Sequence, residues 1–496
     1  NLASRHKDLH IDDLAEKEYK EALDSYRKLA KEYPAAFFPD VALTLGNLAG
    51  LHKDLHNFDL AEREYSEALD SRRKLAEKNP DAFLPDVALT LGNLANLHSD
   101  LHKYELAEQE YNETLEIYHK LAEKNPDAFL PDVARNQGNL AILHKDLHQY
   151  VLAEDEYNKA LDIYRKLAVE NPDAFLPDVA MNLGNLANLY FDLQKYDLAE
   201  EEFNEALKIY YRLDEMSNNA FFHPIAIYLG DLANVHYLQH KYDIAEAEYK
   251  EALRIDGKLA EENPDAFLPS AASMLGNLAC LHHKSRNFET SEQEFNDALK
   301  IYRKLAEENP DAFLPKVAKN LGNLADLHKD LNKYDVSEAE FYEAIDIYHK
   351  LIEPNANAFC RDMARNIGNL ATLHRRLKKY ELAEQEYNEA IRIYRKLAED
   401  NSNLYLPDVA LSINNLSHLH WILGKYNFAE QGYNEVASVY GKLAKESPNI
   451  YNPNIASAMN MLAYCYYKLG KYDLVLPTIE EAISLDPITE YYDSKG

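Results

Sequence analysis

Apolar and polar positions follow helical periodicity inside a block of 46 residues that recurs along the chain. Between Pro85 and Leu130, one stripe has the three- and four-residue spacing of a helix face and consists of Val87, Ala88, Leu91, Leu94, Ala95, His98 and Leu101. After a turn near His102, a second stripe consists of Tyr104, Ala107, Tyr111, Leu115, Tyr118 and Leu121. We therefore expect two helices per block, the first beginning at Pro85 and the second ending before Pro126.

A near-constant L-G-N-L-A string fixes the register of the blocks. Its central residue recurs every 46 residues, at Asn47, Asn93, Asn139, Asn185, Asp231, Asn277, Asn323, Asn369 and Asn415, with Asn1 and Met461 in the same register. A constant period of this length is typical of stacked helical repeats. The sequence thus predicts one solenoid domain over residues 1–487, with an incomplete first repeat, a shorter last repeat near 450–487, and a polar tail at 488–496.

One aromatic residue per block stands between the predicted helices of neighbouring blocks. It is Phe129 in the block above, and it recurs as Phe37, Phe83, Phe175, Phe221, Phe267, Phe313, Phe359, Tyr405 and Tyr451. We expect this residue to anchor each connecting loop to the helix pair. Two loops, Met216–Pro224 and Glu353–Arg361, depart from the pattern and are candidate places for partner contact or a change in superhelical pitch.

The helix–turn–helix pattern resembles the tetratricopeptide repeat. The residues that keep the family spacing are Leu94, Ala95, His98, Tyr104, Ala107, Tyr111, Thr114 and Leu115. A histidine replaces the usual first-helix aromatic residue, and His102 replaces the usual turn glycine, which Gly424 and Gly470 retain. Each block is 12 residues longer than the standard repeat (46 − 34 = 12), and we place the extra length in the second helix and the F-L-P-D-V-A loop.

Long blocks with N-L-A in the first helix and Y-x-x-A-E-x-x-Y in the second helix are similar to those of kinesin light chain and its bacterial relatives. This resemblance covers nearly the whole chain. It implies an all-α, right-handed superhelical solenoid of antiparallel helix pairs, with about ten 46-residue tetratricopeptide-like repeats. It also implies a peptide-binding groove lined by the first-helix asparagines Asn93, Asn139, Asn185, Asn277, Asn323, Asn369 and Asn415.

A helical wheel of the first helix places Leu89, Asn93, Asn96 and Asp100 opposite the core stripe. Since the first helices of stacked pairs line the concave surface, we expect this row to line the groove. The asparagine column offers a donor and an acceptor in every repeat, which suits the backbone of an extended peptide. The alternative, which stays open, is that each asparagine bonds to the neighbouring first helix and orders the stack.

Groove positions that vary between blocks are candidates for specificity. A cationic group consists of Lys284, Lys319, Arg365 and Arg376, with Arg375 alongside. It suggests capture of an acidic stretch or a carboxylate terminus, unless it is a solvated surface balanced by Asp326 and Asp330. Aromatic residues form two groups, one of Phe191 and Tyr237 in adjacent repeats and one of His418, Trp421, Tyr464 and Tyr467. These side chains either anchor a partner or pack against the next helix pair.

Composition narrows the class of function. The chain has 53 basic and 84 acidic residues and a net charge of −31, which disfavours nucleic acid and anionic membranes. Three scattered cysteines form no metal-type pair and favour a reducing, cytoplasmic location. No phosphate loop, nucleophile elbow or dinucleotide motif occurs. We therefore expect neither an enzyme nor a bound cofactor or metal.

Histidine pairs four residues apart, such as His98 and His102, have a spacing that zinc can use. One member of each pair lies on the core stripe and the other lies at the turn, so we expect packing rather than a metal site. If the core histidines are buried and neutral, acid should loosen the solenoid by forcing them to take up charge.

The sequence therefore favours a scaffold that binds a protein or peptide segment in the concave groove. One alternative is the sensor arm of a larger multidomain protein, because the sequence starts at Asn1 in the middle of a repeat. Another alternative is a structural solenoid that associates with copies of itself.

Overall fold

The computed structural model describes residues 2–9, 11–217, 219–352, 359–445 and 447–486, and every regular element in this part of the chain is an α-helix. The chain divides into two compact units, residues 1–248 and residues 249–496, with the boundary inside α12 (Tyr242–Glu262). The predicted tail at 488–496 and residues 353–358 of the second irregular loop lie outside the described residues.

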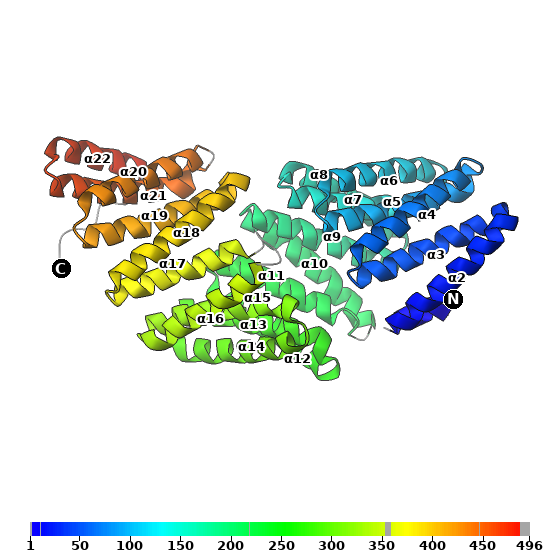
Figure 1. Ribbon diagram of the computed structural model, residues 1–496, viewed down its shortest axis with the longest axis horizontal. Helices are drawn as coiled ribbons and strands as arrows, with labels where there is room; N and C mark the ends of the chain where they lie inside the picture. Colours follow the sequence, from blue (N-terminus) through cyan, green and yellow to red (C-terminus); the bar gives the residue numbers. More distant parts are fainter. Residues whose placement is uncertain (1, 10, 218, 353–358, 446, 487–496) are drawn as a thin grey trace. The chain divides into compact units, whose positions relative to one another are not determined.

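The first unit contains α1 (Leu2–Asp8), α2 (Asp12–Glu32), α3 (Pro34–Asp54), α4 (Phe58–Ala76), α5 (Pro80–Asp100), α6 (Tyr104–Lys124), α7 (Pro126–Asp146), α8 (Tyr150–Glu170), α9 (Pro172–Asp192), α10 (Tyr196–Ser217) and α11 (Phe222–Leu238). The second contains α13 (Pro264–Lys284), α14 (Phe288–Glu308), α15 (Pro310–Asp330), α16 (Tyr334–Ile352), α17 (Cys360–Arg376), α18 (Tyr380–Asp400), α19 (Ser402–Ile422), α20 (Tyr426–Leu443), α21 (Pro448–Lys468) and α22 (Tyr472–Leu485). Within each unit, helices pack against their neighbours in sequence as stacked antiparallel pairs (Figure 1). The predicted all-α fold of repeated helix pairs is confirmed.

The first helix of each full repeat begins earlier than predicted. In α5, Asn79 is the N-cap and Pro80 occupies the first turn, so Pro85 lies inside the helix. Proline is tolerated there because Asp81, whose carbonyl would accept the missing N–H bond, is exposed near the helix start. The expected F-L-P-D-V-A loop is therefore wrong. The extra length of the repeat lies in two helices of 21 residues each, α5 and α6. At the two irregular places, α11 and α17 are shorter, with 17 residues each.

The two predicted apolar stripes form the core of each repeat. In α5 the buried side chains include Val87, Leu91 and His98, and in α6 they include Tyr111 and Tyr118. Three alanines of the same stripes, Ala88, Ala95 and Ala107, are completely buried. Leu101 and Tyr104, at the turn, are only half-buried. The core prediction is confirmed except at these two turn positions.

The repeated aromatic residue lies at the start of the next first helix rather than in a loop. Phe129 is in α7, and its ring centroid lies 6.4 Å from that of Tyr118 in α6. The same contact recurs in other repeats as Tyr26–Phe37, Tyr210–Phe221, Tyr348–Phe359 and Tyr440–Tyr451. The anchoring contact is confirmed in these repeats, whereas the loop location of Phe129 is wrong because α7 already begins at Pro126.

The turn between the two helices of a repeat contains one residue in the left-handed conformation. His102 has a φ of 57° and Lys378 a φ of 59°, whereas Gly424 has a φ of 71° at the equivalent position. Glycine adopts this conformation without strain, but residues with a Cβ do not. His102 gains a local contact in return, since its Nδ1 lies 2.6 Å from the Tyr104 hydroxyl.

In several repeats, a buried histidine on the first helix connects the repeat to the one before it. His374 in α17 is 2.8 Å from Glu386 in α18 through Nδ1, and 3.0 Å from Glu338 in α16 through Nε2. Lys379 donates to the same Glu338 carboxylate at 2.7 Å. His52, His98 and His328 each lie between two glutamates at the equivalent positions of their own and the preceding repeat. These histidines therefore link three helices through charge-assisted hydrogen bonds.

At His328 and His374 the surroundings contradict the expectation that acid loosens the solenoid through the core histidines. Burial alone would lower the pKa of His374, but hydrogen bonds to Glu386 and Glu338 outweigh burial and raise it. For His328, the hydrogen bond to Glu340 is the largest influence, and its pKa is also raised. At His328 and His374 the protonated imidazole is therefore favoured in the folded protein, because each of these two rings lies between two carboxylates.

The linkage is incomplete around His144 in α7. Neither ring nitrogen of His144 has a hydrogen-bond partner among the described residues, and its nearest carboxylate, Glu108, lies 3.7 Å away. Gln149 stands where other repeats have a lysine. Glu156, the second expected carboxylate neighbour, has a buried oxygen without a partner in the described structure.

Glycine in the L-G-N string allows close approach of neighbouring first helices. A Cβ added to Gly322 in α15 would lie 2.2 Å from Oδ1 of Asn366 in α17, whereas a Cβ added to Gly368 would meet nothing within 4 Å. Asn366 is held in place because its Nδ2 donates to the Asp362 carbonyl at 2.8 Å. Stacking of α15 on α17 therefore requires glycine at position 322.

Candidate functional site

The row predicted to line the groove lies on the first helices, at the positions equivalent to Leu89, Asn93, Asn96 and Asp100. We call these positions the first-helix face. In the first unit its asparagines Asn47, Asn93, Asn139 and Asn185 are half-buried, and their amides have no hydrogen-bond partner among the described residues. Four consecutive repeats thus present an amide that is available to another molecule.

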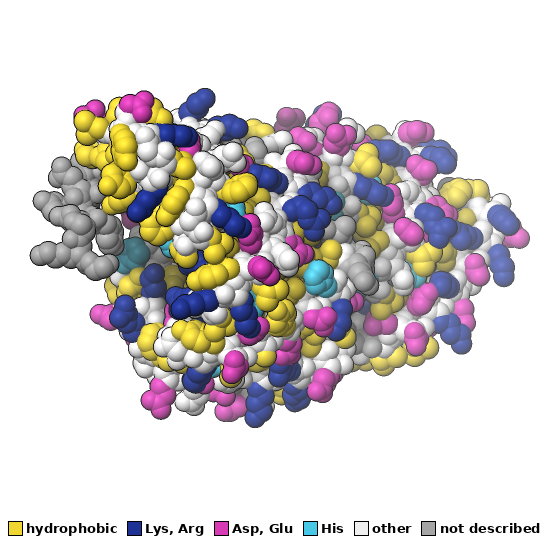
Figure 2. Space-filling model, turned by 60° about the vertical axis from the view of Figure 1, so that its left-hand side comes forward, with side chains coloured by type: hydrophobic (Ala, Val, Ile, Leu, Met, Phe, Trp, Pro, Cys, Tyr) yellow, Lys and Arg dark blue, Asp and Glu magenta, His cyan; other side chains and the backbone are white. Residues whose placement is uncertain are grey.

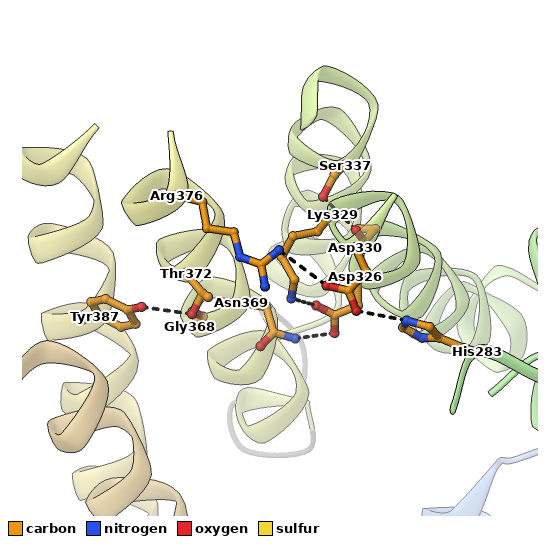
Figure 3. A network of polar contacts seen from close by, with 11 residues as sticks. His283, Asp326, Lys329, Asp330, Ser337, Gly368, Asn369, Thr372, Arg376 and Tyr387 are labelled. Carbon is orange, nitrogen blue, oxygen red and sulfur yellow. Dashed lines mark hydrogen bonds and ion pairs between the residues drawn. The ribbon is translucent and has the colours of Figure 1, made fainter. Parts of the chain in front are cut away.

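The same column is engaged within the chain in part of the second unit. Asn369 donates to Asp326 at 2.8 Å, and Asn323 lies 3.6 Å from the Cys280 sulfur (Figure 3 shows the first of these contacts). Both contacts join neighbouring first helices, as the stacking alternative requires. Asn277 also has interactions inside the protein, whereas Asn415 has no partner in the described part of the chain. The hydrogen bonding of this asparagine column therefore differs between repeats.

Asp231 replaces asparagine in this column of the first unit. Burial raises the pKa of its carboxyl to about 6, against the effect of a hydrogen bond from Asn188. Asn188 lies on the preceding first helix, so Asp231 makes a stacking contact like that of Asn369.

Charged pairs connect the ends of neighbouring first helices. Lys53 lies 2.9 Å from Asp100, and Lys145 lies 3.0 Å from Asp192. In the second unit His283 takes the place of the lysine and lies 3.2 Å from Asp330. Arg376 stands where these aspartates stand in other repeats, and it reaches back to Asp330 at 3.5 Å (Figure 3). The charge of Arg376 is therefore partly balanced within the protein.

The other predicted cations differ in their surroundings. Arg365 donates to Asp362 at 2.7 Å. Lys284 and Lys319 are exposed and have no ion pair with any described residue. Figure 2 shows positive and negative side chains interspersed over one face of the molecule, as is typical of a solvated surface.

Lys316 is a cation that the sequence analysis missed. Burial, followed by the charge of Lys319, lowers its pKa. Lys319 and Arg365 also act on the Cys280 thiol, although burial dominates and raises the pKa of that thiol to about 11. These influences place Lys316, Lys319 and Arg365 near one another, and we call them the cationic cluster. The missed signal was a lysine at position 316, where Asp86, Asp132 and Asp178 stand in other repeats.

The predicted aromatic residues pack against the chain itself. The rings of Phe191 and Tyr237 contact Tyr196 and Tyr242 at centroid distances of 5.9 and 5.7 Å. Trp421 stacks on His418 at 6.3 Å and packs against the core around Tyr433 and Leu462. These contacts favour the packing alternative. Tyr464 and Tyr467 remain more than half exposed, at 54% and 57%.

The histidines of the zinc-like pairs have separate partners. His98 lies between Glu110 and Glu62, at 2.8 and 3.2 Å, whereas His102 contacts the Tyr104 hydroxyl. No cluster of three metal-ligating side chains occurs among the described residues.

A hollow at Gly50 is the second feature that the sequence analysis missed. It lies on the first-helix face of the first unit and is lined by residues that include Asn47, Gly50, Tyr65 and Asn93. Gly50 stands where the next repeat has Asn96. The available signal was therefore a glycine in a column of larger residues.

The sequence pattern of the tetratricopeptide repeat matches six segments, of which residues 40–120, 86–166, 132–212, 178–258 and 224–304 overlap in succession and residues 316–396 are separate. A second pattern of the same description matches residues 456–489. The chain belongs to the tetratricopeptide-repeat family. This membership agrees with the stacked helix pairs and with the resemblance noted in the sequence.

Solved tetratricopeptide-like structures are similar to parts of this chain. BtubC (BKLC) from P. vanneervenii is 23% identical over 49% of this chain and 90% of its own, with a TM-score of 0.41. The apo form of RapI is 16% identical over 63% and 99%, with a TM-score of 0.46. A putative kinesin light chain with nearly identical repeats, from Podosopora anserina, is 15% identical over 45% and 98%, with a TM-score of 0.36. No curated protein matches this tetratricopeptide-repeat chain.

The helices of the described residues do not meet the requirements of a membrane span. None of them combines the length and the apolar character needed to cross a bilayer.

Proposed function

We propose that this tetratricopeptide-repeat chain is an interaction scaffold, without catalytic activity, that holds an extended peptide or protein segment against its first-helix face. The supporting observation is the run of amides at Asn47, Asn93, Asn139 and Asn185, none of which has a hydrogen-bond partner in the part of the chain that the structure describes. Each amide offers a donor and an acceptor, so the run suits the alternating N–H and C=O groups of an extended backbone. The first unit is the proposed main-chain binding site.

The second unit adds a proposed preference for acidic segments. Lys316 and Lys319 have no ion pair among the described residues, and Arg365 has one carboxylate partner, Asp362. In a chain with a net charge of −31, such a cluster is a local exception that attracts carboxylates. Arg376, Phe191, Tyr237 and Trp421 contribute less in this proposal, because each already has contacts within the protein.

The test is a peptide selection followed by affinity measurement. Random 15-residue peptides displayed on phage are selected against the protein, and the best peptide is synthesised with a fluorophore. Fluorescence polarisation then compares the protein with a variant in which Asn93, Asn139 and Asn185 are all alanine. Each lost hydrogen bond is worth about 0.5–1.5 kcal/mol, so the three together should weaken binding at least about tenfold.

The matched control replaces Asn323 and Asn369, which are engaged within the chain, by alanine. We expect this variant to lose stability because the contacts to Cys280 and Asp326 disappear, but to bind the peptide as before. Unchanged affinity in the triple variant would remove the amides from the binding site. If no peptide is selected at all, the scaffold proposal fails.

The alternatives from the sequence remain predictions with their own tests. The complete open reading frame shows whether an effector domain accompanies the repeats, and light scattering shows whether the chain associates with itself. A cytoplasmic location belongs to the same proposal and is tested by fluorescence microscopy of the tagged protein.

A further inference from the structure

The hollow at Gly50 differs from the rest of the first-helix face. It has a volume of about 350 Å³, and its lining includes Lys7, Asn47, Gly50, Tyr65 and Asn93. Its polar groups come from five helices: Ser4 and Lys7 in α1, Tyr19 in α2, Asn47 in α3, Tyr65 in α4 and Asn93 in α5. All of these residues belong to the first unit.

The next repeat shows what normally fills this place. There, Oδ1 of Asn96 accepts a hydrogen bond from the Tyr111 hydroxyl. Equivalent pairs join Ser4 to Tyr19 at 3.0 Å and Thr372 to Tyr387 at 2.9 Å. Since Gly50 has no side chain, the hydroxyl of Tyr65 lacks such a partner among the described residues.

The empty position matches a neutral hydrogen-bond acceptor. Burial, together with the nearby Asp54 and Glu64, raises the pKa of Tyr65 to about 12, so its hydroxyl keeps its proton and can donate it. Lys7, whose Nζ would lie 3.5 Å from a Cβ at Gly50, is already paired with Asp54 at 2.8 Å. The positive charge in the hollow is therefore balanced, and an incoming carboxylate gains less there than an amide, which needs no counter-charge.

We propose that the hollow at Gly50 binds the side-chain carboxamide of an asparagine or glutamine in the bound segment. The carboxamide oxygen accepts from the Tyr65 hydroxyl, as Asn96 accepts from Tyr111 in the next repeat. The unpartnered amides of Asn47 and Asn93 lie beside it and can pair with the carboxamide NH₂ group. This inference rests on the proposed function and specifies one side chain of the peptide that this face selects.

The decisive variant is Gly50→Asn, which fills the hollow with the side chain that the next repeat carries. Gly50 lies within helix α3, where asparagine is tolerated at least as well as glycine, and an added Cβ would make only ordinary contacts. Peptides selected against the natural chain should contain asparagine or glutamine at one position. Alanine at that position should weaken binding about 3- to 10-fold, and Gly50→Asn should abolish this difference.

Tyr65→Phe is the matched control. It removes the hydroxyl but not the ring, and Phe203 and Phe295 occupy the same column elsewhere. The loss of affinity that Tyr65→Phe causes for the peptide with asparagine or glutamine should equal the loss that alanine in the peptide causes with the natural chain. Selected peptides without asparagine or glutamine, or an alanine penalty that persists in Gly50→Asn, would overturn the carboxamide site while leaving the scaffold proposal intact. If a peptide with glutamate at the same position bound more tightly than the peptide with asparagine or glutamine, the hollow would instead be assigned to carboxylates.

A small-molecule probe tests the hollow even if no peptide is selected. Propionamide should shift the NMR signal of the Tyr65 ring carbon that bears the hydroxyl, while propionate shifts it less and the Tyr111 signal stays in place. The Tyr65 signal should stop responding in Gly50→Asn. An unmoved Tyr65 signal, or equal responses of Tyr65 and Tyr111, would overturn the inference independently of the scaffold proposal.

Discussion

Replacing Gly322 by alanine tests how closely neighbouring first helices must approach. The new Cβ would lie 2.2 Å from Oδ1 of Asn366, about 1.2 Å short of ordinary contact, which begins at 3.4 Å. Asn366 is only 3% exposed, and it must give up its hydrogen bond to Asp362 if it moves away. Losing a buried hydrogen bond costs about 1–3 kcal/mol, and overpacking without movement costs a similar amount.

Gly368→Ala is the matched control, because it makes the same chemical change in the same column with nothing within 4 Å. Both variants gain about 1 kcal/mol of helix propensity, so the difference between them isolates the clash and should be about 1–3 kcal/mol. Urea unfolding followed by circular dichroism measures both. Ser412 occupies the position in the next repeat that is equivalent to Asn366, and it stands in the same relation to Gly368 as Asn366 does to Gly322. Adding Asn366→Ser should therefore rescue Gly322→Ala. Equal unfolding midpoints for the two alanine variants would refute the close-approach argument.

Two further predictions concern the histidine links and the turns. Because the pKa values of His328 and His374 are raised on folding, their stabilising effect is complete below the ordinary histidine pKa of about 6.5 and is lost as pH rises through the raised value. The Tm should therefore be higher near pH 6 than near pH 8.5, and His374→Gln should shrink this difference; a Tm that falls from pH 8.5 to pH 6 would contradict it. Lys378→Gly should stabilise the chain by about 1 kcal/mol, and Gly424→Ala should destabilise it similarly, because both residues have positive φ; urea midpoints that move the other way would argue against strain at the turn.

The sequence was sufficient for the helix pairs because the apolar stripes repeat with helical spacing in every block. It failed at the start of the first helix, because proline is a strong boundary signal and two prolines, Pro80 and Pro85, stand close together there. Either proline can occupy the first turn of a helix, so the sequence pattern alone does not decide between them.

The candidate site was only partly accessible from the sequence. The wheel placed Asn93 and Asn369 on the same face, but it could not show that Asn369 has a partner, because that partner, Asp326, belongs to another repeat. The neutral state considered for the core histidines is wrong at His328 and His374 for the same reason, since the glutamates beside them lie 12 and 36 residues away in sequence. Contacts between repeats depend on how the repeats stack, which a single-block pattern does not contain.

The incomplete links around His144 have a consequence for the dynamics of the first unit. In a repeat protein, cooperativity depends on the coupling between neighbouring repeats, and here the charge-assisted bonds that supply part of that coupling elsewhere are missing. Local opening should therefore begin where α6 and α8 flank α7, and backbone amides there should exchange with solvent deuterium sooner than those around His374. Asn139, one of the free amides, lies on this same helix. A bound segment crossing this seam would join two parts of the unit that otherwise open independently, so slower exchange in α7 would report its arrival.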